Sequence, residues 1–455
     1  SNPTPATPIL SGLVGSEMCI RDRDSNNAFI SFNQLQMPAD KVPIAVKDNI
    51  DVKDMITSAG SLALENNLIT EDAFLVTKLK QNNYFIIGKT NLSEWANFRS
   101  TGSVSGWSSL GGQTLNSYGR NLNPCGSSSG SAVAVKDGLV EVAIGTETNG
   151  SISCPASVNG IVGIKPTVGL VSRHGIVPIS STQDTAGPMT KSVALAAQVL
   201  SAISGFDPKD KATYNIPSNM TFNFADDLSL DGLQNKRLGL LVSGQEYEIG
   251  QKLLDKIKNT IAALGGEVVM IEDNREYPGN DEYFLLLYEF KYGIDKYLQS
   301  KKNLNVSSLD DLIEFNEANK DEVMQYFDQD IFYQSEEASL DQQRYEDAKK
   351  IVLEAQNDIQ YILNQNNLDA LVGLTRNPAW EINYDGGDNK AMDKQLSWGN
   401  GGFAAIAGFP HITVPLSLVN GLPVGVSFIG SAWSEKSLLE MAYAFEQFNQ
   451  VGEIE

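Results

Sequence analysis

Short apolar runs alternate with amphipathic segments from residue 41 to about residue 206. The run KVPIAVKDNI (41–50) predicts a strand that leads into a loop, and YFIIGKTN (84–91) predicts a buried strand. Between them, residues 72–81 place apolar side chains at helical spacing and predict a helix. The alternation continues through SAVAVKDGL, EVAIGTET and VGIKPTVGLV. This order predicts an α/β fold, in which a large, mixed, mostly parallel central sheet is covered by helices on both faces.

The second half of the chain repeats this pattern around a long helical segment. After a polar stretch, the pattern predicts a strand, RLGLLVS, and a helix, QKLLDKIKNTIAALGG. Residues from about 278 to 366 are mainly helical and acidic, and the strands NLDALVGLT and HITVPLSLV and a last helix follow. We therefore expect a single domain over residues 25–455, with a core at about 41–206 and a helical insert at about 278–366.

Residues 1–24 differ from the rest of the chain. The stretch LVGSEMCIRD is similar to a translated sequencing-library adapter, of the kind found at gene ends assembled from environmental DNA. We therefore treat residues 1–24 as an adapter-like or disordered leader and leave them out of the fold prediction. A natural signal peptide can be lost with such a start, so the sequence predicts no compartment.

The charge of the chain narrows the choice of partners. It carries 34 basic and 56 acidic residues, for a net charge of −22, which repels phosphate backbones and argues against a nucleic-acid partner. The most apolar candidate for a membrane helix, residues 131–145, contains three charged side chains, so we expect no membrane span. We expect a monomer or homodimer.

Few histidines and cysteines are available for chemistry. The two histidines, His174 and His411, lie in no nucleophile or metal motif, and HExxH and P-loop patterns are absent. A hydrolase of this sequence would therefore need a base other than histidine, and we expect no metal or other cofactor. The three cysteines, Cys19, Cys125 and Cys154, suggest neither a disulfide framework nor a zinc site.

Three segments together fit a hydrolase without a catalytic histidine. CGSSSGSA (125–132) is a serine-rich turn before a helix, GTETNGS (145–151) follows a strand, and Lys47 ends an apolar strand. A serine nucleophile needs a base, and burial favours the neutral lysine that can act as one. Each segment alone has a simpler explanation, because serine-rich turns commonly cap helices and a lysine after a strand is commonly solvated.

The stretch from 125 to 167, CGSSSGSAVAVKDGLVEVAIGTETNGSISCPASVNGIVGIKPT, resembles the signature of the amidase signature family. Further matches are GKTNLSEWANF, VSRHGIVPISSTQDTAGPM and GLPVGVSFIG, so the resemblance covers nearly all of residues 41–445. The motifs are most similar to the peptide amidase branch, whose members deamidate C-terminal carboxamides of peptides. The resemblance implies the amidase signature fold and a serine hydrolase that cleaves carboxamide C–N bonds through an acyl-enzyme. The substrate that it implies is a small-molecule or peptide amide, such as a peptide C-terminal amide or an aryl or alkyl amide.

The resemblance also implies roles for single residues. The nucleophile falls on Ser151, the bridging serine, which the family holds on a cis peptide bond, on Ser127, and the lysine on Lys47. The implied oxyanion donors are the backbone N–H groups of Thr148, Asn149, Gly150 and Ser151.

The chain departs from the family pattern at a few positions. Cys125 and Ser129 stand where the family has glycine in the serine loop, and Asn149 stands where many members have glycine. Asn tolerates a left-handed backbone better than most residues do. The family's N-terminal helices are also missing, which puts the stability and part of the site wall in question.

The leaving group and the biological setting stay open. Aromatic side chains of the insert could cover the pocket, which would suit an aryl-acylamidase or a urethanase acting on anilides and carbamates, or could pack the helices together. Two further alternatives are a glutamine-hydrolysing subunit of a tRNA-dependent amidotransferase and a catalytically silent binding protein. The aromatic side chains in question are Tyr283, Phe284, Tyr288, Phe290, Tyr326, Phe327, Phe332 and Tyr333.

Overall fold

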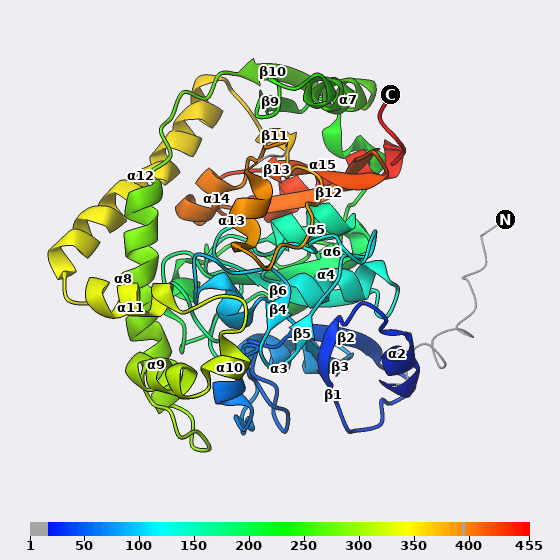
Figure 1. Cartoon of the computed structure of the whole chain (residues 1–455). Coiled ribbons are helices and arrows are strands. Elements are labelled where there is room, and N and C mark those ends of the chain that lie inside the picture. The colour runs from blue at the N-terminus through cyan, green and yellow to red at the C-terminus, as the bar shows by residue number, and fades with distance from the viewer. Residues whose placement is uncertain (1–16, 394–395) are drawn as a thin grey trace.

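An eleven-stranded sheet runs through the computed structural model, which describes residues 17–393 and 396–455 (Figure 1). Its strands lie in the order β1-β3-β2-β6-β8-β7-β12-β13-β11-β9-β10. Their bounds are β1 (Phe29–Phe32), β2 (Val42–Lys47), β3 (Tyr84–Thr90), β6 (Val142–Glu147), β7 (Val162–Lys165), β8 (Thr185–Thr190), β9 (Arg237–Leu241), β10 (Glu267–Ile271), β11 (Ala370–Leu374), β12 (His411–Val419) and β13 (Leu422–Ile429). A separate pair is formed by β4 (Trp107–Ser108) and β5 (Gly112–Gln113).

The sheet is mixed, and its parallel pairs form two groups. Strands β3, β2 and β6 pair in parallel on one side, and β11, β9 and β10 pair in parallel on the other. Between these groups, from β6 through β8, β7, β12 and β13 to β11, each pair is antiparallel. The prediction of a large mixed sheet among helices is confirmed, with the parallel pairs gathered toward the two sides.

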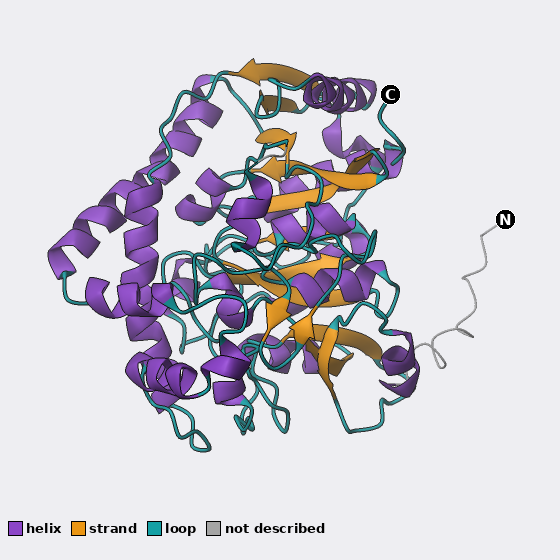
Figure 2. Cartoon of the chain, viewed as in Figure 1, coloured by secondary structure: helices purple, strands orange, loops and turns teal. Residues whose placement is uncertain are grey.

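Helices cover both faces of the sheet (Figure 2). Alternate residues of β2 show the two faces, because Ile44 and Val46 pack into one core cluster and Ala45 into another. The first cluster includes side chains of α3, α6, α7 and α15, and the second includes side chains of α4 and α5. The helices are α3 (Phe74–Gln81), α4 (Ser129–Lys136), α5 (Ser153–Asn159), α6 (Val193–Ile203), α7 (Glu248–Ala263), α13 (Gly387–Met392), α14 (Gly402–Ala407) and α15 (Glu435–Phe448). Within the described ranges, every helix is too short or too polar to span a bilayer.

The predicted helical insert lies along one side of the molecule, at the left of Figure 1. Its aromatic side chains form a core of their own with a loop of the first half, since Phe290 and Phe332 are fully buried and contact Phe98 and Trp95. Its helices are α8 (Gly279–Gln299), α9 (Leu309–Ala318), α10 (Lys320–Val323), α11 (Asp330–Ala338) and α12 (Gln342–Gln365).

The described part of the N-terminal segment packs onto the domain. Residues Glu17–Arg23 form α2, and Ile20 on this helix is fully buried. The carboxylate of Asp24 then accepts the backbone N–H groups of Ala28 and Phe29 at 2.7 and 2.9 Å. Residues 17–24, which the sequence analysis left outside the fold, therefore contribute to it, whereas residues 1–16 lie outside the described residues.

A disulfide joins Cys125 to Cys154, whose Cα atoms lie 6.0 Å apart. The expectation from the cysteine count was therefore wrong. That expectation considered only number and spacing, whereas folding brings together two cysteines that are 29 residues apart in the sequence. The bond ties the loop that carries Ser127 to the first turn of α5, just after Ser151.

We expect this disulfide to contribute to stability by restricting the unfolded chain. Replacing both Cys125 and Cys154 by serine should lower the free energy of unfolding by about 3–4 kcal/mol for a loop of this length. Urea denaturation followed by circular dichroism measures the change. The matched control is Cys19→Ser, which lies outside this disulfide, and an equal loss in the control would contradict the prediction.

Candidate active site

Three segments meet at one edge of the sheet. Lys47 is the last residue of β2, Ser151 follows β6, and Ser127 lies just before α4. Because β2 and β6 are parallel neighbours, with Ala45 opposite Ala143, their carboxyl ends lie side by side. The sheet pairing therefore brings Lys47 to the loop that carries Ser151.

The amino group of Lys47 is fully buried and surrounded by oxygen atoms. Lys47 Nζ lies 2.7 Å from Ser127 Oγ and 3.0 Å from Ser128 Oγ. It also lies 2.8 Å from Thr146 Oγ1 and 3.3 Å from the main-chain oxygen of Thr146. These contacts fix the position of the amine without placing a carboxylate against it.

The environment of Lys47 favours its neutral form. Burial lowers the pKa of Lys47 to about 7, although the negative charges of Asp184 and Glu147 partly oppose this shift. An ordinary lysine has a pKa near 10.4 and is almost fully charged at neutral pH. A large fraction of Lys47 can therefore accept a proton at neutral pH.

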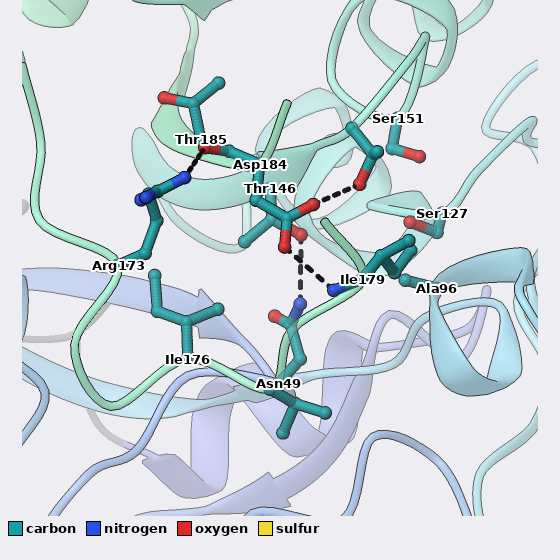
Figure 3. A pocket seen from close by; sticks show the side chains of 12 residues that line it. Asn49, Ala96, Ser127, Thr146, Ser151, Arg173, Ile176, Ile179, Asp184 and Thr185 are labelled. Atoms are coloured by element: carbon teal, nitrogen blue, oxygen red, sulfur yellow. Dashed lines mark hydrogen bonds between the residues drawn. The ribbon is translucent and has the colours of Figure 1, made fainter. Parts of the chain in front are cut away.

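The serine loop has the backbone form that the resemblance implies. The peptide bond between Gly126 and Ser127 is cis, and Ser127 is fully buried. A hydrogen bond of 3.1 Å from the backbone N–H of Ser128 to the main-chain oxygen of Ser151 joins this loop to the Ser151 loop. Ser127 and Ser151 line the same pocket (Figure 3).

The loop around Ser151 is held by a buried carboxylate. Glu147 Oε1 accepts the backbone N–H groups of Ile152 and Ser153 at 3.0 and 2.9 Å. Gly150, with φ of 87°, supplies a left-handed backbone that other residues adopt at a cost. These features turn the chain sharply between β6 and α5, and they leave Ser151 only 9% exposed.

The implied oxyanion donors keep their hydrogen-bonding capacity for a ligand. Among the described residues, the backbone N–H groups from Thr148 to Ser151 donate to no protein acceptor. Four consecutive donors beside a serine hydroxyl can stabilise negative charge on a reacting oxygen.

The pocket that contains the two serines is narrow. The space open to a water-sized molecule is about 10 Å³, which is room for about one such group. Its lining residues are Asn49, Ala96, Ser127, Thr146, Thr148, Ser151, Arg173, Ile176, Val177, Ile179, Asp184 and Thr185.

Two lining residues, Asp184 and Arg173, received no role from the sequence. Burial raises the pKa of Asp184, whose Oδ1 accepts the hydroxyl of Thr148 at 2.6 Å. Arg173 Nη1 donates to the main-chain oxygen of Asp184, 3.1 Å away. Both residues lie in the matched segment VSRHGIVPISSTQDTAGPM, which was the available signal, but nothing in that segment shows what its side chains touch.

The aromatic residues of the insert do not surround this pocket. None of the eight candidates, all of them described residues, is among its lining side chains. Tyr288 instead lines a neighbouring groove of about 740 Å³, together with Tyr292 and Tyr345. The groove shares Arg173 and Asp184 with the narrow pocket, so the two spaces adjoin.

Both histidines lie away from Ser151. His411 is buried on β12 with its Nε2 atom 2.7 Å from Ser427 Oγ, and burial lowers the pKa of His411 to about 4. His174 lines the larger groove. Neither ring is among the side chains that line the pocket of Ser151.

Comparison with known proteins gives consistent matches over the chain. A family model described as Amidase matches residues 16–439. The Arabidopsis thaliana protein named "Probable amidase At4g34880" is 38% identical over 454 residues, covering 96% of this chain and 81% of the relative. Native peptide amidase from Stenotrophomonas maltophilia has a structure that superposes with a TM-score of 0.88 at 41% identity, covering 96% of this chain and 93% of that chain.

A more distant relative has a different role. This relative, one of the subunits of the glutamyl-tRNA(Gln) amidotransferase from Thermodesulfovibrio yellowstonii, is 32% identical over 445 residues, covering 93% of this chain and 86% of the relative. The family model, the Arabidopsis thaliana relative and the Stenotrophomonas maltophilia structure are all described as amidases. The peptide amidase, at 41% identity, is more similar to this chain than the amidotransferase subunit, at 32%. The chain therefore belongs to the amidase signature family and is an amidohydrolase similar to the peptide amidases.

Proposed function

We propose that this amidohydrolase hydrolyses C-terminal carboxamides of peptides and related linear amides through an acyl-enzyme on Ser151. The observation that carries this proposal is the buried amine of Lys47, 2.7 Å from Ser127 Oγ, in contact with the pocket that also contains Ser151. The arrangement provides a base, a relay and a nucleophile without a histidine.

In the first step, Ser151 Oγ attacks the acyl carbon of the amide. Its proton passes to Ser127 Oγ, and the proton of Ser127 passes to neutral Lys47. The backbone N–H groups of Thr148 to Ser151 stabilise the oxyanion that forms. The C–N bond then breaks as Ser127 returns a proton to the leaving nitrogen and regains one from Lys47. A water molecule hydrolyses the acyl-enzyme by the same proton path.

The narrow pocket supports a small leaving group. The small space beside Ser151 is compatible with the NH₂ of a primary carboxamide as the leaving group. The similarity to peptide amidase structures supports a peptide as the acyl part. Anilides, aryl carbamates and free glutamine represent the aryl-acylamidase, urethanase and amidotransferase alternatives.

Wild-type protein should release ammonia from a peptide C-terminal amide, and Ser151→Ala should reduce this activity by at least about a thousandfold. Mass spectrometry of a panel with a peptide amide, an acyl anilide, an aryl carbamate and glutamine measures the products. The matched control is Ser131→Ala, which removes a different buried serine hydroxyl, in the first turn of α4. Hydrolysis of the anilide or carbamate alone would assign the activity to an aryl-acylamidase or urethanase, and loss of activity in the control alone would contradict the role of Ser151.

Activity should rise with pH through about 7, because only the neutral form of Lys47 accepts a proton. Below this pKa, kcat/KM should fall about tenfold for each pH unit. Lys47→Arg should be inactive throughout the same range, because arginine keeps its proton. A pH profile of kcat/KM tests this, and a profile that is flat from pH 5 to 9 in wild type would contradict the role of Lys47.

A further inference from the structure

The side chain of Asn149 connects the loop before Ser151 to the helical insert. Asn149 Nδ2 lies 2.7 Å from Glu282 Oε1 and 2.9 Å from the hydroxyl of Tyr277. Glu282 belongs to the first turn of α8, and Tyr277 precedes that helix. A residue without a polar side chain at position 149 could not make this connection.

Glu282 is the centre of a small network. Its Oε1 atom also accepts Gln183 Nε2 at 2.9 Å, and its Oε2 atom accepts the hydroxyl of Tyr277 at 2.6 Å. Burial and the nearby carboxylate raise the pKa of Tyr277, so its hydroxyl keeps the proton that it donates. Glu282 itself is only 7% exposed, so water competes little for these bonds.

The same network reaches the backbone of the loop. Gln183 Nε2 donates to the main-chain oxygen of Thr148 at 3.2 Å. The same nitrogen donates its second hydrogen bond to Glu282 Oε1. The C=O of Thr148 and the N–H of Asn149 belong to one planar trans peptide unit, so they point in opposite directions. Fixing the carbonyl of Thr148 therefore also fixes the direction of the N–H of Asn149.

Packing alone restrains this loop weakly. The side chain of Asn149 is exposed, and apart from the adjoining residues no atom lies within 4 Å of the place where a β-carbon on Gly150 would sit. The hydroxyl of Thr148, bound to Asp184, holds the loop at one end. Hydrogen bonds therefore supply most of the restraint on Thr148 and Asn149.

We propose that Glu282, acting through Gln183 and Asn149, is a positioning residue that aims the Thr148–Asn149 peptide unit at the reacting oxygen. The inference rests on the proposed function, since it assumes that the N–H of Asn149 is an oxyanion donor. The helical insert then acts on catalysis through its first turn, at a distance from its aromatic core.

Glu282→Ala should lower kcat about tenfold or more and change KM by less than about twofold, because the loss falls on the transition state. The matched control is Asp281→Ala, in the same turn of α8, whose carboxylate pairs with Arg344 at 2.7 Å instead of with the loop. The control should keep kcat within about twofold of wild type. An equal fall in both variants, or a rise in KM with unchanged kcat, would overturn the proposal.

A second set of variants keeps the inference testable if Glu282→Ala folds poorly. Asn149→Ala removes the side chain that binds Glu282, and Glu282→Gln replaces one of the two acceptor oxygens by an NH₂ group. The double variant Asn149→Ala/Glu282→Gln combines the two changes. The double variant should lose no more than about the larger single effect, because both changes break one connection. Losses that multiply in the double variant, or an unchanged kcat in Asn149→Ala, would overturn the proposal.

Phosphonylation of Ser151 by a fluorophosphonate separates this inference from the substrate assignment. The rate constant for labelling depends on the nucleophile and the oxyanion donors and needs no amide substrate, so it should fall in Glu282→Ala and stay unchanged in Asp281→Ala. If the wild-type protein is labelled rapidly but hydrolyses no peptide amide, the proposed substrate is contradicted and the positioning role is not. If Glu282→Ala is labelled at the wild-type rate, the positioning role of Glu282 is contradicted and the proposed substrate is not.

Discussion

The contact between Lys47 Nζ and Ser127 Oγ joins the end of a buried strand to a loop 80 residues further along the chain. A charged amine at this place would lose several kcal/mol of hydration. The fold resolves this conflict by lowering the pKa of Lys47 to about 7 and by surrounding the amine with hydroxyl and carbonyl oxygens. The parallel pairing of β2 with β6, the serine loop and the loop of Ser151 must all be in place for that environment to exist. The lowered pKa of Lys47 therefore depends on several segments that meet at the carboxyl ends of these strands.

The helical insert has two separate relations to this edge. Several of its aromatic side chains pack against one another and against the loop that contains Trp95 and Phe98, where they stabilise the insert as a unit. Only the start of α8 reaches the loop of Ser151, through Glu282. A large apolar core thus gives a rigid support to one polar contact near the pocket, and rigid support is what precise placement of a donor requires.

Much of the fold followed from the sequence because local pattern and local structure agree. The apolar runs at β2 and β3 and the helical spacing at α3 predicted their elements, with boundaries shifted by one or two residues. Lys47, Ser127 and Ser151 were found together because the motif preserves their order and spacing. Their roles remain predictions, while the structure places the two serines in one pocket and Lys47 in contact with Ser127.

The remaining features depend on contacts between distant parts of the chain. Asn149 and Glu282 are 133 residues apart, and no local pattern in α8 distinguishes Glu282 from its acidic neighbours. The direction of the aromatic side chains depends on how α8 packs against α11 and α12, which helical periodicity alone does not determine. The disulfide was missed for the same reason, because Cys125 and Cys154 come together only where the serine loop packs against the start of α5.

The covalent state of the molecule depends on the redox conditions under which it is produced, because of the disulfide. A reducing cytosol keeps cysteine thiols reduced, whereas an oxidising environment allows Cys125 and Cys154 to form a disulfide. Two preparations of the same sequence can therefore differ in whether the Cys125–Cys154 bond is formed, although their amino-acid sequence is the same. The oxidation state of a sample thus becomes a variable of the enzyme itself, to be set and verified by intact-mass measurement before rates from different hosts are compared.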